Sequence, residues 1–310
     1  MTPRLVGSIE APAKINLFLR VLHRREDGFR ELETLFQMLE LADDVRVRFD
    51  PTGQADEVTL DVDGPDLGAV DENLAVRAVR AFMAASRVRG SVHVSLVKRI
   101  PAGGGLGGGS SDAAAVLRLL AELTAGCDAG VHGGASLPRT ELHAIAASLG
   151  SDVPFFLGGA SLALGRGRGE VLSPLPPLPS IPVVLALPPV HVSTAGAYSA
   201  LAESRTAEAS FHARPDDLVA DLDWTRIASL AENDFEGIAM EGYRPIARSI
   251  EGLRGAGAQV TLLSGSGAAA FGVFESSAAA HAAAATLESE LGWPFVVTAT
   301  REAPPQLMRG

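Results

Sequence analysis

A glycine-rich stretch at residues 101–111 constrains this chain more than any other feature. It contains six glycines within seven residues, followed by two serines. Glycine brings no side chain to a core and loses the most backbone freedom on ordering, so such a stretch serves close approach of the backbone to another group. Residues 112–123 then place apolar side chains at helical spacing. The pattern predicts a glycine loop that leads into a helix N-terminus, where unpaired N–H groups bind phosphate.

Two familiar phosphate-binding patterns do not fit this loop. Gly103, Gly105 and Gly108 match the dinucleotide fingerprint, but the acidic residue needed about 20 residues later is missing, since Glu122 lies inside the predicted helix. A P-loop has lysine before its Ser or Thr, and residues 109–111 contain none. A purely structural hinge is the remaining alternative, although no fold needs so many glycines between a strand and a helix.

The composition limits the classes of partner. A chain of 310 residues with 47% apolar residues can bury one large or two medium cores. The net charge of -11 argues against a nucleic-acid-binding protein, which shows a basic face. The N-terminus lacks a signal-peptide core, and no run approaches the roughly 18 apolar residues of a membrane span. We therefore expect a cytoplasmic protein with small-molecule partners, without nucleic-acid or membrane binding.

Cysteine, histidine and lysine usage adds three observations. The single cysteine, Cys127, excludes an internal disulfide and has no catalytic signature around it. The seven histidines show no metal-ligand spacing, so no protein metal site is expected. Only Lys14 and Lys98 are lysines among the 26 basic residues. Since an ammonium differs chemically from a guanidinium, both lysines are mild pointers to function.

The order of apolar patterns predicts an α+β chain of two domains without internal repeats. Alternating residues at 44–50 and 57–63 indicate antiparallel strands, and 224–255 is expected to be helical in two pieces. The Pro-rich segment 174–182 is the best linker, so we divide the chain into domains 1–175 and 176–310. Residues 124–138 and 204–215 are expected to be loops.

A first strand is predicted over residues 8–22. Its alternation places Lys14 and Asn16 on one face, together with Phe18 and Arg20. Another alternating run, residues 91–100, leads directly into the glycine loop. Strand, loop and helix therefore follow in the order that a phosphate cradle needs.

At three places the sequence resembles the motifs of the GHMP small-molecule kinases. Ala-Pro-Ala-Lys-Ile-Asn-Leu at 11–17, the glycine loop through Asp112, and Leu-Ser-Gly-Ser-Gly-Ala at 263–268 follow one another in the order of that family. The resemblance spans about residues 11–274 and implies a two-domain fold with the ATP and substrate cleft between the domains.

Further segments narrow this resemblance. Residues 27–32, 150–156 and 233–236 look like those of GHMP kinases that act on a cytidine-diphosphate-linked methylerythritol. The reaction implied is ATP-dependent phosphorylation of its 2-hydroxyl, in the non-mevalonate isoprenoid pathway. Two alternatives stay open: another GHMP kinase of homoserine or mevalonate type, and a nucleotide-binding sensor without catalysis.

The resemblance assigns catalysis to Lys14 and Asp152. An aspartate that accepts the proton of the substrate hydroxyl, and a lysine that keeps the aspartate ionised, are sufficient for phosphoryl transfer, which depends mainly on positioning and charge neutralisation. Judged from the residues alone, Asp152 could equally be a turn or helix-terminus carboxylate. The presence of both residues counts against a sensor.

The resemblance also implies that the glycine loop binds ATP, with Asn73 and Lys98 on the adenosine side. The loop residues concerned are Pro101, Ala102, Gly103, Gly104, Gly105, Leu106, Gly107, Gly108, Gly109, Ser110 and Ser111. Mg²⁺ is expected to arrive with ATP, held by phosphate oxygens and by Ser110 or Asp112 rather than in a protein cage. Asn73 has an alternative role as a helix N-cap.

Substrate contacts are implied near both ends of the chain. The residues concerned are Asn16, Phe29, Arg30, Thr194, Tyr198 and Gly267. Phe29 and Tyr198 would clamp the cytosine ring, although Phe29 could be a core aromatic and Thr194 a helix cap. The family usually has Tyr-His where this chain has Phe29 and Arg30. Phenylalanine keeps the stacking face, whereas arginine donates but cannot accept a hydrogen bond.

Overall fold

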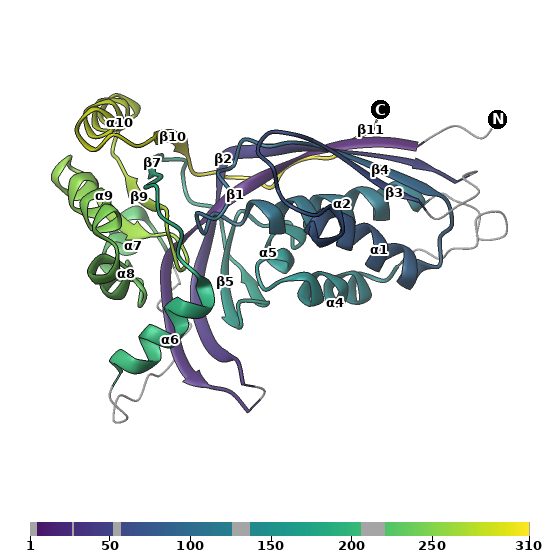
Figure 1. Cartoon of the computed structure of the whole chain (residues 1–310), viewed down its shortest axis with the longest axis horizontal. Helices are drawn as coiled ribbons and strands as arrows, with labels where there is room; N and C mark the ends of the chain where they lie inside the picture. The colour runs from purple at the N-terminus through teal and green to yellow at the C-terminus, as the bar shows by residue number, and fades with distance from the viewer. Residues whose placement is uncertain (1–4, 27, 52–56, 126–136, 206–220, 310) are drawn as a thin grey trace.

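The computed structural model describes residues 5–26, 28–51, 57–125, 137–205 and 221–309. Two β-sheets with helices packed on them form the molecule, and the long strands β1 and β2 run through its centre (Figure 1). The strands are β1 (Leu5–Arg24), β2 (Arg30–Asp50), β3 (Val58–Asp63), β4 (Ser91–Val97), β5 (Leu162–Gly167), β6 (Val171–Pro174), β7 (Pro182–Ala186), β8 (Val260–Leu263), β9 (Ala270–Val273), β10 (Phe295–Ala299) and β11 (Met308–Arg309).

Helices connect these strands and lie outside the sheets. They are a short 3-10 helix (Val70–Glu72), α1 (Leu74–Ser86), α2 (Gly108–Thr124), α4 (Arg139–Leu149), α5 (Val153–Leu157), α6 (Thr194–Ser204), α7 (Trp224–Leu230), α8 (Glu236–Gly242), α9 (Arg244–Gly255) and α10 (Ser277–Leu291). None of the helices in the described ranges combines the length and the apolarity needed to cross a membrane.

The larger sheet has the strand order β11-β1-β2-β4-β3, with β5 beside another part of β2 and β6 beside β5. Helices α1, α2, α4 and α5 lie together on one side of it (Figure 1). Helix α2 is largely buried: its run of three alanines is buried, and Leu117 and Leu120 enter the same core as Phe49 and Phe82. This packing fixes the helix that follows the glycine loop.

The smaller sheet has the order β10-β7-β9-β8 and carries α9 and α10. Apolar residues of this sheet, such as Val183 and Phe271, share a core with Ile15, Leu17 and Leu35 of the long strands. The two sheets are therefore joined by one apolar layer.

Residues 175–181 lead from the larger sheet to the smaller one, and β11 returns the chain end to β1. We propose on this basis that the division at residues 175 and 176 separates two domains, with the last strand added to the first of them.

Strand directions correct one prediction. The segment 44–50 is the end of β2 and runs antiparallel to β4, as expected. The segment 57–63, however, pairs parallel to β4, so the antiparallel prediction is wrong for β3. Helix α1 forms the connection between β3 and β4, and such a crossover is what a parallel pair needs. Alternation indicates a strand but not its direction.

Two further expectations fail locally. Residues 224–255 form three helices rather than two pieces, since residue 233 bridges to β1 and a new helix, with Pro245 in its first turn, begins after Tyr243. In β1 the register shifts between Asn16 and Phe18, so Phe18 enters the core instead of sharing a face with Lys14. Loops are also expected at residues 124–138 and 204–215, and most residues of both segments lie outside the described ranges.

Candidate functional site

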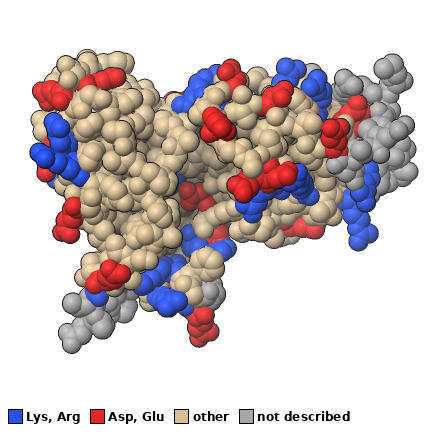
Figure 2. Space-filling view, in the orientation of Figure 1, with Lys and Arg blue, Asp and Glu red and all other residues tan. Residues whose placement is uncertain are grey.

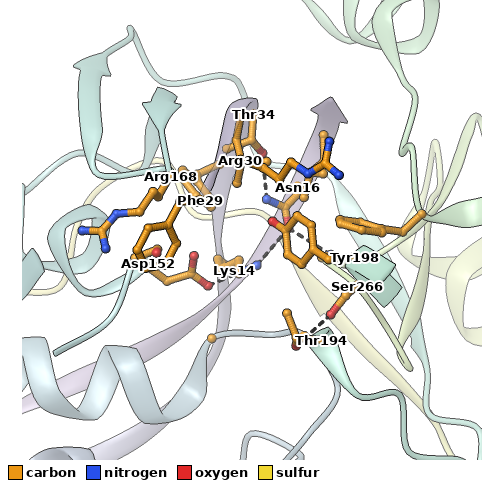
Figure 3. Close-up of a pocket in the computed structure, with 18 of the residues that line it drawn as sticks. Lys14, Asn16, Phe29, Arg30, Thr34, Asp152, Arg168, Thr194, Tyr198 and Ser266 are labelled. Carbon is orange, nitrogen blue, oxygen red and sulfur yellow. Dashed lines mark hydrogen bonds and ion pairs between the residues drawn. The ribbon is translucent and has the colours of Figure 1, made fainter. Parts of the chain in front are cut away.

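A cavity of about 570 Å³ opens between the glycine loop, the long strands and α6 (Figure 3). It brings together segments from distant parts of the sequence. The predicted site residues that line it are Lys14, Asn16, Phe29, Arg30, Gly105, Gly107, Asp152, Thr194 and Tyr198. Side chains in its lining that the sequence interpretation missed include Arg24, Thr34, Phe36, Arg168, Phe235 and Ser266.

The glycine loop needs glycine for two separate reasons. Gly103, Gly105 and Gly107 have φ values of +76°, +73° and +75°, a region that other residues rarely adopt. A Cβ on Gly105 would lie 2.3 Å from the carbonyl oxygen of Ser264, and one on Gly107 would lie 3.0 Å from Phe156 Cζ. The loop therefore bends sharply and also lets two other segments approach its backbone.

The segment 11–17 is hydrogen-bonded to this loop and to the segment 263–268, the third of the three motifs. The backbone N–H of Lys14 donates to the Leu106 carbonyl over 2.9 Å. The N–H of Gly265 donates to Asn16 Oδ1 over 3.0 Å, and the Ser264 hydroxyl donates to the Gly105 carbonyl over 3.0 Å. All three motifs thus meet at one point of the cavity wall.

Asn233 fixes the turn of the third motif. Its side-chain amide donates to the carbonyls of Leu263 and Gly265, each over 2.8 Å, and the residue is buried. Its Oδ1 also accepts from the N–H of Phe235 over 2.9 Å. A buried amide with these partners holds the turn against the glycine loop.

The Lys14 ammonium is the charged centre of the site. Its Nζ donates to Asn16 Oδ1 over 2.8 Å and lies 3.4 Å from Asp152 Oδ2. The lysine side chain is 4% exposed and the aspartate 30%, so the carboxylate faces the cavity while its partner is shielded. Asn16 in turn donates to Thr34 Oγ1 over 2.8 Å, which fixes the orientation of its amide.

Aromatic packing places Asp152. It directly precedes α5, whose Phe155 ring stacks on Phe36 with 4.9 Å between centroids. Phe156 lies against Gly107 of the loop. Asp152 makes no capping hydrogen bond to α5. Asp152 thus stands at the N-terminus of α5 without capping it, and its carboxylate points toward Lys14 (Figure 3).

The far end of the cavity is aromatic and basic. Phe29 is 53% exposed, which rules out the core alternative for this ring. Tyr198 packs edge-on against Phe235 at 4.9 Å between centroids. Burial, and then the charge of Asp152, raises the pKa of Tyr198 to about 12, so the phenol remains a hydrogen-bond donor at neutral pH. Basic side chains gather over the nearby end of the β1–β2 hairpin (Figure 2).

Other predicted residues lie near the cavity in different roles. Ser193 rather than Thr194 caps α6, because its hydroxyl accepts from the Gly196 N–H. The Thr194 hydroxyl is paired with Ser266 Oγ over 3.1 Å. Gly267, with φ +98°, closes the turn of the third motif and does not line the cavity.

The other residues of the glycine loop differ in exposure. Ala102 and Gly103 are exposed and Pro101 is half-buried, whereas Gly104 and Leu106 are buried. The last four residues of the loop, 108–111, form the first turn of α2. Gly108 and Ser110 there are half-buried, Gly109 is exposed and Ser111 is buried.

Asn73 and Lys98 are not among the cavity residues. Asn73 caps α1, since its Oδ1 accepts from the Ala75 N–H over 2.9 Å, as its alternative role predicted. The Lys98 side chain is 4% exposed and donates to Asp43 and Asp112. Across the described ranges, no group of three His, Cys, Asp or Glu side chains could hold a metal ion.

Comparison with known protein families agrees with this arrangement of the motifs. The description "GHMP kinases N terminal domain" matches residues 73–160, and "GHMP kinases C terminal" matches 217–292. A 4-diphosphocytidyl-2-C-methyl-D-erythritol kinase of Solibacter usitatus (strain Ellin6076) is 42% identical over 270 residues, covering 86% of this chain and 80% of the relative. The chain belongs to the GHMP kinases, in the family of 4-diphosphocytidyl-2-C-methyl-D-erythritol kinases. A second relative with that name, from Gloeobacter violaceus (strain ATCC 29082 / PCC 7421), is 39% identical and covers 95% of this chain and 94% of its own.

Solved structures agree with this family. A crystal structure of 4-(cytidine 5'-diphospho)-2C-methyl-D-erythritol kinase has a TM-score of 0.72 and 37% identity, covering 94% of this chain and 98% of its own. A homoserine kinase from Cytophaga hutchinsonii ATCC 33406 shares the fold, with a TM-score of 0.69 at 16% identity over 99% and 98% of the two chains. The expected α+β GHMP kinase fold is confirmed, and the chain is an ATP-dependent small-molecule kinase.

In this kinase a buried ionic cluster pins both ends of the glycine loop. Asp43 of β2 accepts from the N–H groups of Arg99 and Ile100, which precede the loop. Lys98 joins Asp43 to Asp112, which lies on α2 after the loop. Asp112 Oδ1 is buried and has no hydrogen-bond partner among the described residues. Two carboxylates thus share one lysine in a shielded place.

The cluster predicts a pH dependence of stability. Burial raises the pKa of Asp112 to about 7, against the attraction of Lys98, whereas an unfolded aspartate has a pKa of about 3.9. The folded chain therefore binds more protons between about pH 4 and 7, so its free energy of unfolding falls as pH rises through this window. Asp112→Asn should lack that part of the slope. Urea denaturation of both proteins across the window measures the difference, and parallel curves would contradict the prediction.

The loop geometry predicts that Gly105→Ala destabilises the fold. A left-handed conformation costs a residue with a Cβ about 1–2 kcal/mol, and the contact with Ser264 adds to this cost. Gly109→Ala is the matched control for stability, because Gly109 lies in α2 and its Cβ would meet only Leu74 Cδ1, at 3.7 Å. Urea denaturation should show a lower midpoint for Gly105→Ala alone. Equal midpoints would mean that the loop does not dock as described.

Proposed function

We propose that this chain transfers the γ-phosphoryl group of ATP to the 2-hydroxyl of 4-diphosphocytidyl-2-C-methyl-D-erythritol, giving the 2-phosphate and ADP in the non-mevalonate isoprenoid pathway. The observation that carries the proposal is the Lys14–Asp152 pair, which lies in one cavity with the glycine loop and the rings of Phe29 and Tyr198. The names of the relatives at 39–42% identity support the choice of substrate.

The donor side of the site is the glycine loop with the N-terminus of α2. Its backbone N–H groups and helix dipole suit phosphate oxygens, and its bends leave no side chain to obstruct them. ATP supplies the phosphoryl group, and Mg²⁺ bound with it neutralises phosphate charge. Ser110 is the half-buried loop hydroxyl that would hold Mg²⁺, because the Asp112 side chain is buried and its Oδ2 pairs with Lys98.

The chemistry is centred on Asp152. Its carboxylate accepts the proton of the 2-hydroxyl as the substrate oxygen forms its bond to the γ-phosphorus, while the bond from that phosphorus to the oxygen of ADP breaks. Lys14 Nζ lies 3.4 Å from the Asp152 carboxylate and offsets negative charge on the transferred group. Asn16 and Thr34 keep the ammonium in place.

The acceptor side would hold the cytidine end at a distance from this pair. Phe29 and Tyr198 offer ring faces, and a base stacked on an aromatic ring gains about 1–3 kcal/mol. Arg24 and Arg30 line the same region, and no described carboxylate is paired with either. Their guanidinium groups suit the oxygens of a diphosphate.

A panel of alcohols tests the proposed substrate. ADP release would be measured with 4-diphosphocytidyl-2-C-methyl-D-erythritol, homoserine and mevalonate, each with ATP and Mg²⁺. We expect turnover with the first compound only. Turnover with homoserine or mevalonate alone would replace the proposed substrate, and no turnover with any of them would favour the sensor alternative.

Asp152→Asn tests the proposed mechanism. The amide keeps the shape of the side chain but accepts no proton, so kcat should fall about 100-fold or more while ATP binding is retained. Asp61→Asn is the control, since Asp61 is an exposed residue of β3 outside the cavity. Turnover rates and ATP titrations measure both effects. A near-normal rate for Asp152→Asn would remove this residue from the mechanism.

A further inference from the structure

The segment 233–235 contacts both sides of the site. Asn233 holds the turn of the third motif, which is docked on the glycine loop. Phe235 packs against Tyr198 at 4.9 Å between centroids. Asp234 lies between these two residues in the sequence and is bonded to the β1–β2 hairpin and to the end of α6.

Residues 232–234 run parallel to the edge of β1 for one short stretch. The N–H of Leu19 donates to the Glu232 carbonyl over 2.8 Å, and the N–H of Asp234 donates to the Leu19 carbonyl over 3.0 Å. In a parallel ladder the next N–H of β1, that of Val21, would donate to the backbone carbonyl of residue 234. Here it donates to Asp234 Oδ2 over 2.6 Å, and the chain turns into α8 directly afterwards. The carboxylate thus takes the place of a backbone acceptor.

The same carboxylate holds the C-terminal end of α6. Arg205 directly follows this helix, and its Nη2 donates to Asp234 Oδ2 over 2.5 Å. Its Nη1 donates to the Val21 carbonyl. The aspartate therefore binds the N–H of Val21 and the arginine binds its carbonyl. The two side chains are 22% and 15% exposed, and charge-assisted hydrogen bonds of this kind are stronger than those between neutral groups.

The two elements that Asp234 joins supply the acceptor side of the cavity. The hairpin contributes Arg24 and Arg30, and α6 contributes Thr194 and Tyr198. Figure 1 shows α6 beside the hairpin end of β1 and β2. Asp234 is not among the cavity residues itself. Any effect of this residue on substrate binding therefore passes through the hairpin and α6.

We propose that Asp234 is a positioning residue for the acceptor substrate, which acts by fixing the hairpin and α6 relative to each other before the substrate binds. The inference rests on the proposed function, because that function supplies the acceptor. Prior fixing of two cavity walls lowers the entropy lost on binding. The Lys14 ammonium is held by other contacts, among them that of Asn16, so Asp234 affects substrate binding and leaves phosphoryl transfer unchanged.

Kinetics of single variants test this role. Asp234→Ala should raise the substrate KM about tenfold, the lower end of what a hydrogen bond to a charged group contributes, with kcat and the KM for ATP changed less than about twofold. Asp234→Asn should recover part of the loss, because its amide oxygen can still accept from Val21. Glu122→Ala is the matched control, since Glu122 pairs with Arg309 outside the cavity. An unchanged substrate KM, or an equal rise in both KM values, would overturn the inference.

A double-variant cycle tests the link to α6. Arg205→Gln removes the other member of the ion pair and should also raise the substrate KM. Because both residues act on Val21, the double variant should show a smaller rise than the product of the two single rises. A rise equal to that product would mean that the two residues act independently, which overturns the proposal. Asp234→Asn replaces Asp234→Ala in the cycle if the alanine variant does not fold.

Hydrogen–deuterium exchange of the free chain makes the test independent of turnover. Asp234→Ala should exchange faster than Glu122→Ala in peptides that cover residues 17–24 and 195–204, with equal rates in α1. Equal exchange of the two variants in both regions would overturn the proposal even if turnover is normal. Faster exchange with an unchanged substrate KM would make Asp234 merely structural and would overturn it as well. If the unmodified chain does not phosphorylate the proposed substrate, the proposed function fails, and the exchange rates still decide whether Asp234 fixes the two walls.

Discussion

Close contact between two backbone turns is the constraint on which the site depends. Gly105 touches the carbonyl of Ser264 at a distance that leaves no room for a Cβ. Asn16 then accepts from the Gly265 N–H, so β1 is joined to both turns. The glycine loop is therefore shaped by the protein on one side, and we propose that its other side and the start of α2 bind phosphate.

The charged side chains of the site are positioned around this contact between the two turns. Lys14 is hydrogen-bonded through its backbone to the loop, and its ammonium reaches Asp152 because Phe155 and Phe36 stack behind that carboxylate. At the opposite side of the loop, Lys98 holds two buried carboxylates. One lysine thus lies at the proposed catalytic carboxylate, and the other is paired with the carboxylates on both sides of the glycine loop.

Sequence reasoning predicts what depends on local order. A strand, six glycines and an Ala-rich helix follow one another, and Lys14 and Asn16 share a strand face, so the order of strand, loop and helix can be predicted from the chain. The bulge that buries Phe18, the parallel pairing of β3 and the contact of Arg168 with Phe29 depend on partners far away in sequence. Lys98 shows the same limit, because only the fold brings Asp43 and Asp112 to it.

A structure of the chain with a non-hydrolysable ATP analogue and 4-diphosphocytidyl-2-C-methyl-D-erythritol tests the central claim most directly. We expect the γ-phosphate analogue between the glycine loop and Lys14, and the 2-hydroxyl within about 3 Å of an Asp152 oxygen, the reach of a general base. A nucleotide bound away from the loop, or a 2-hydroxyl turned away from Asp152, would contradict the account.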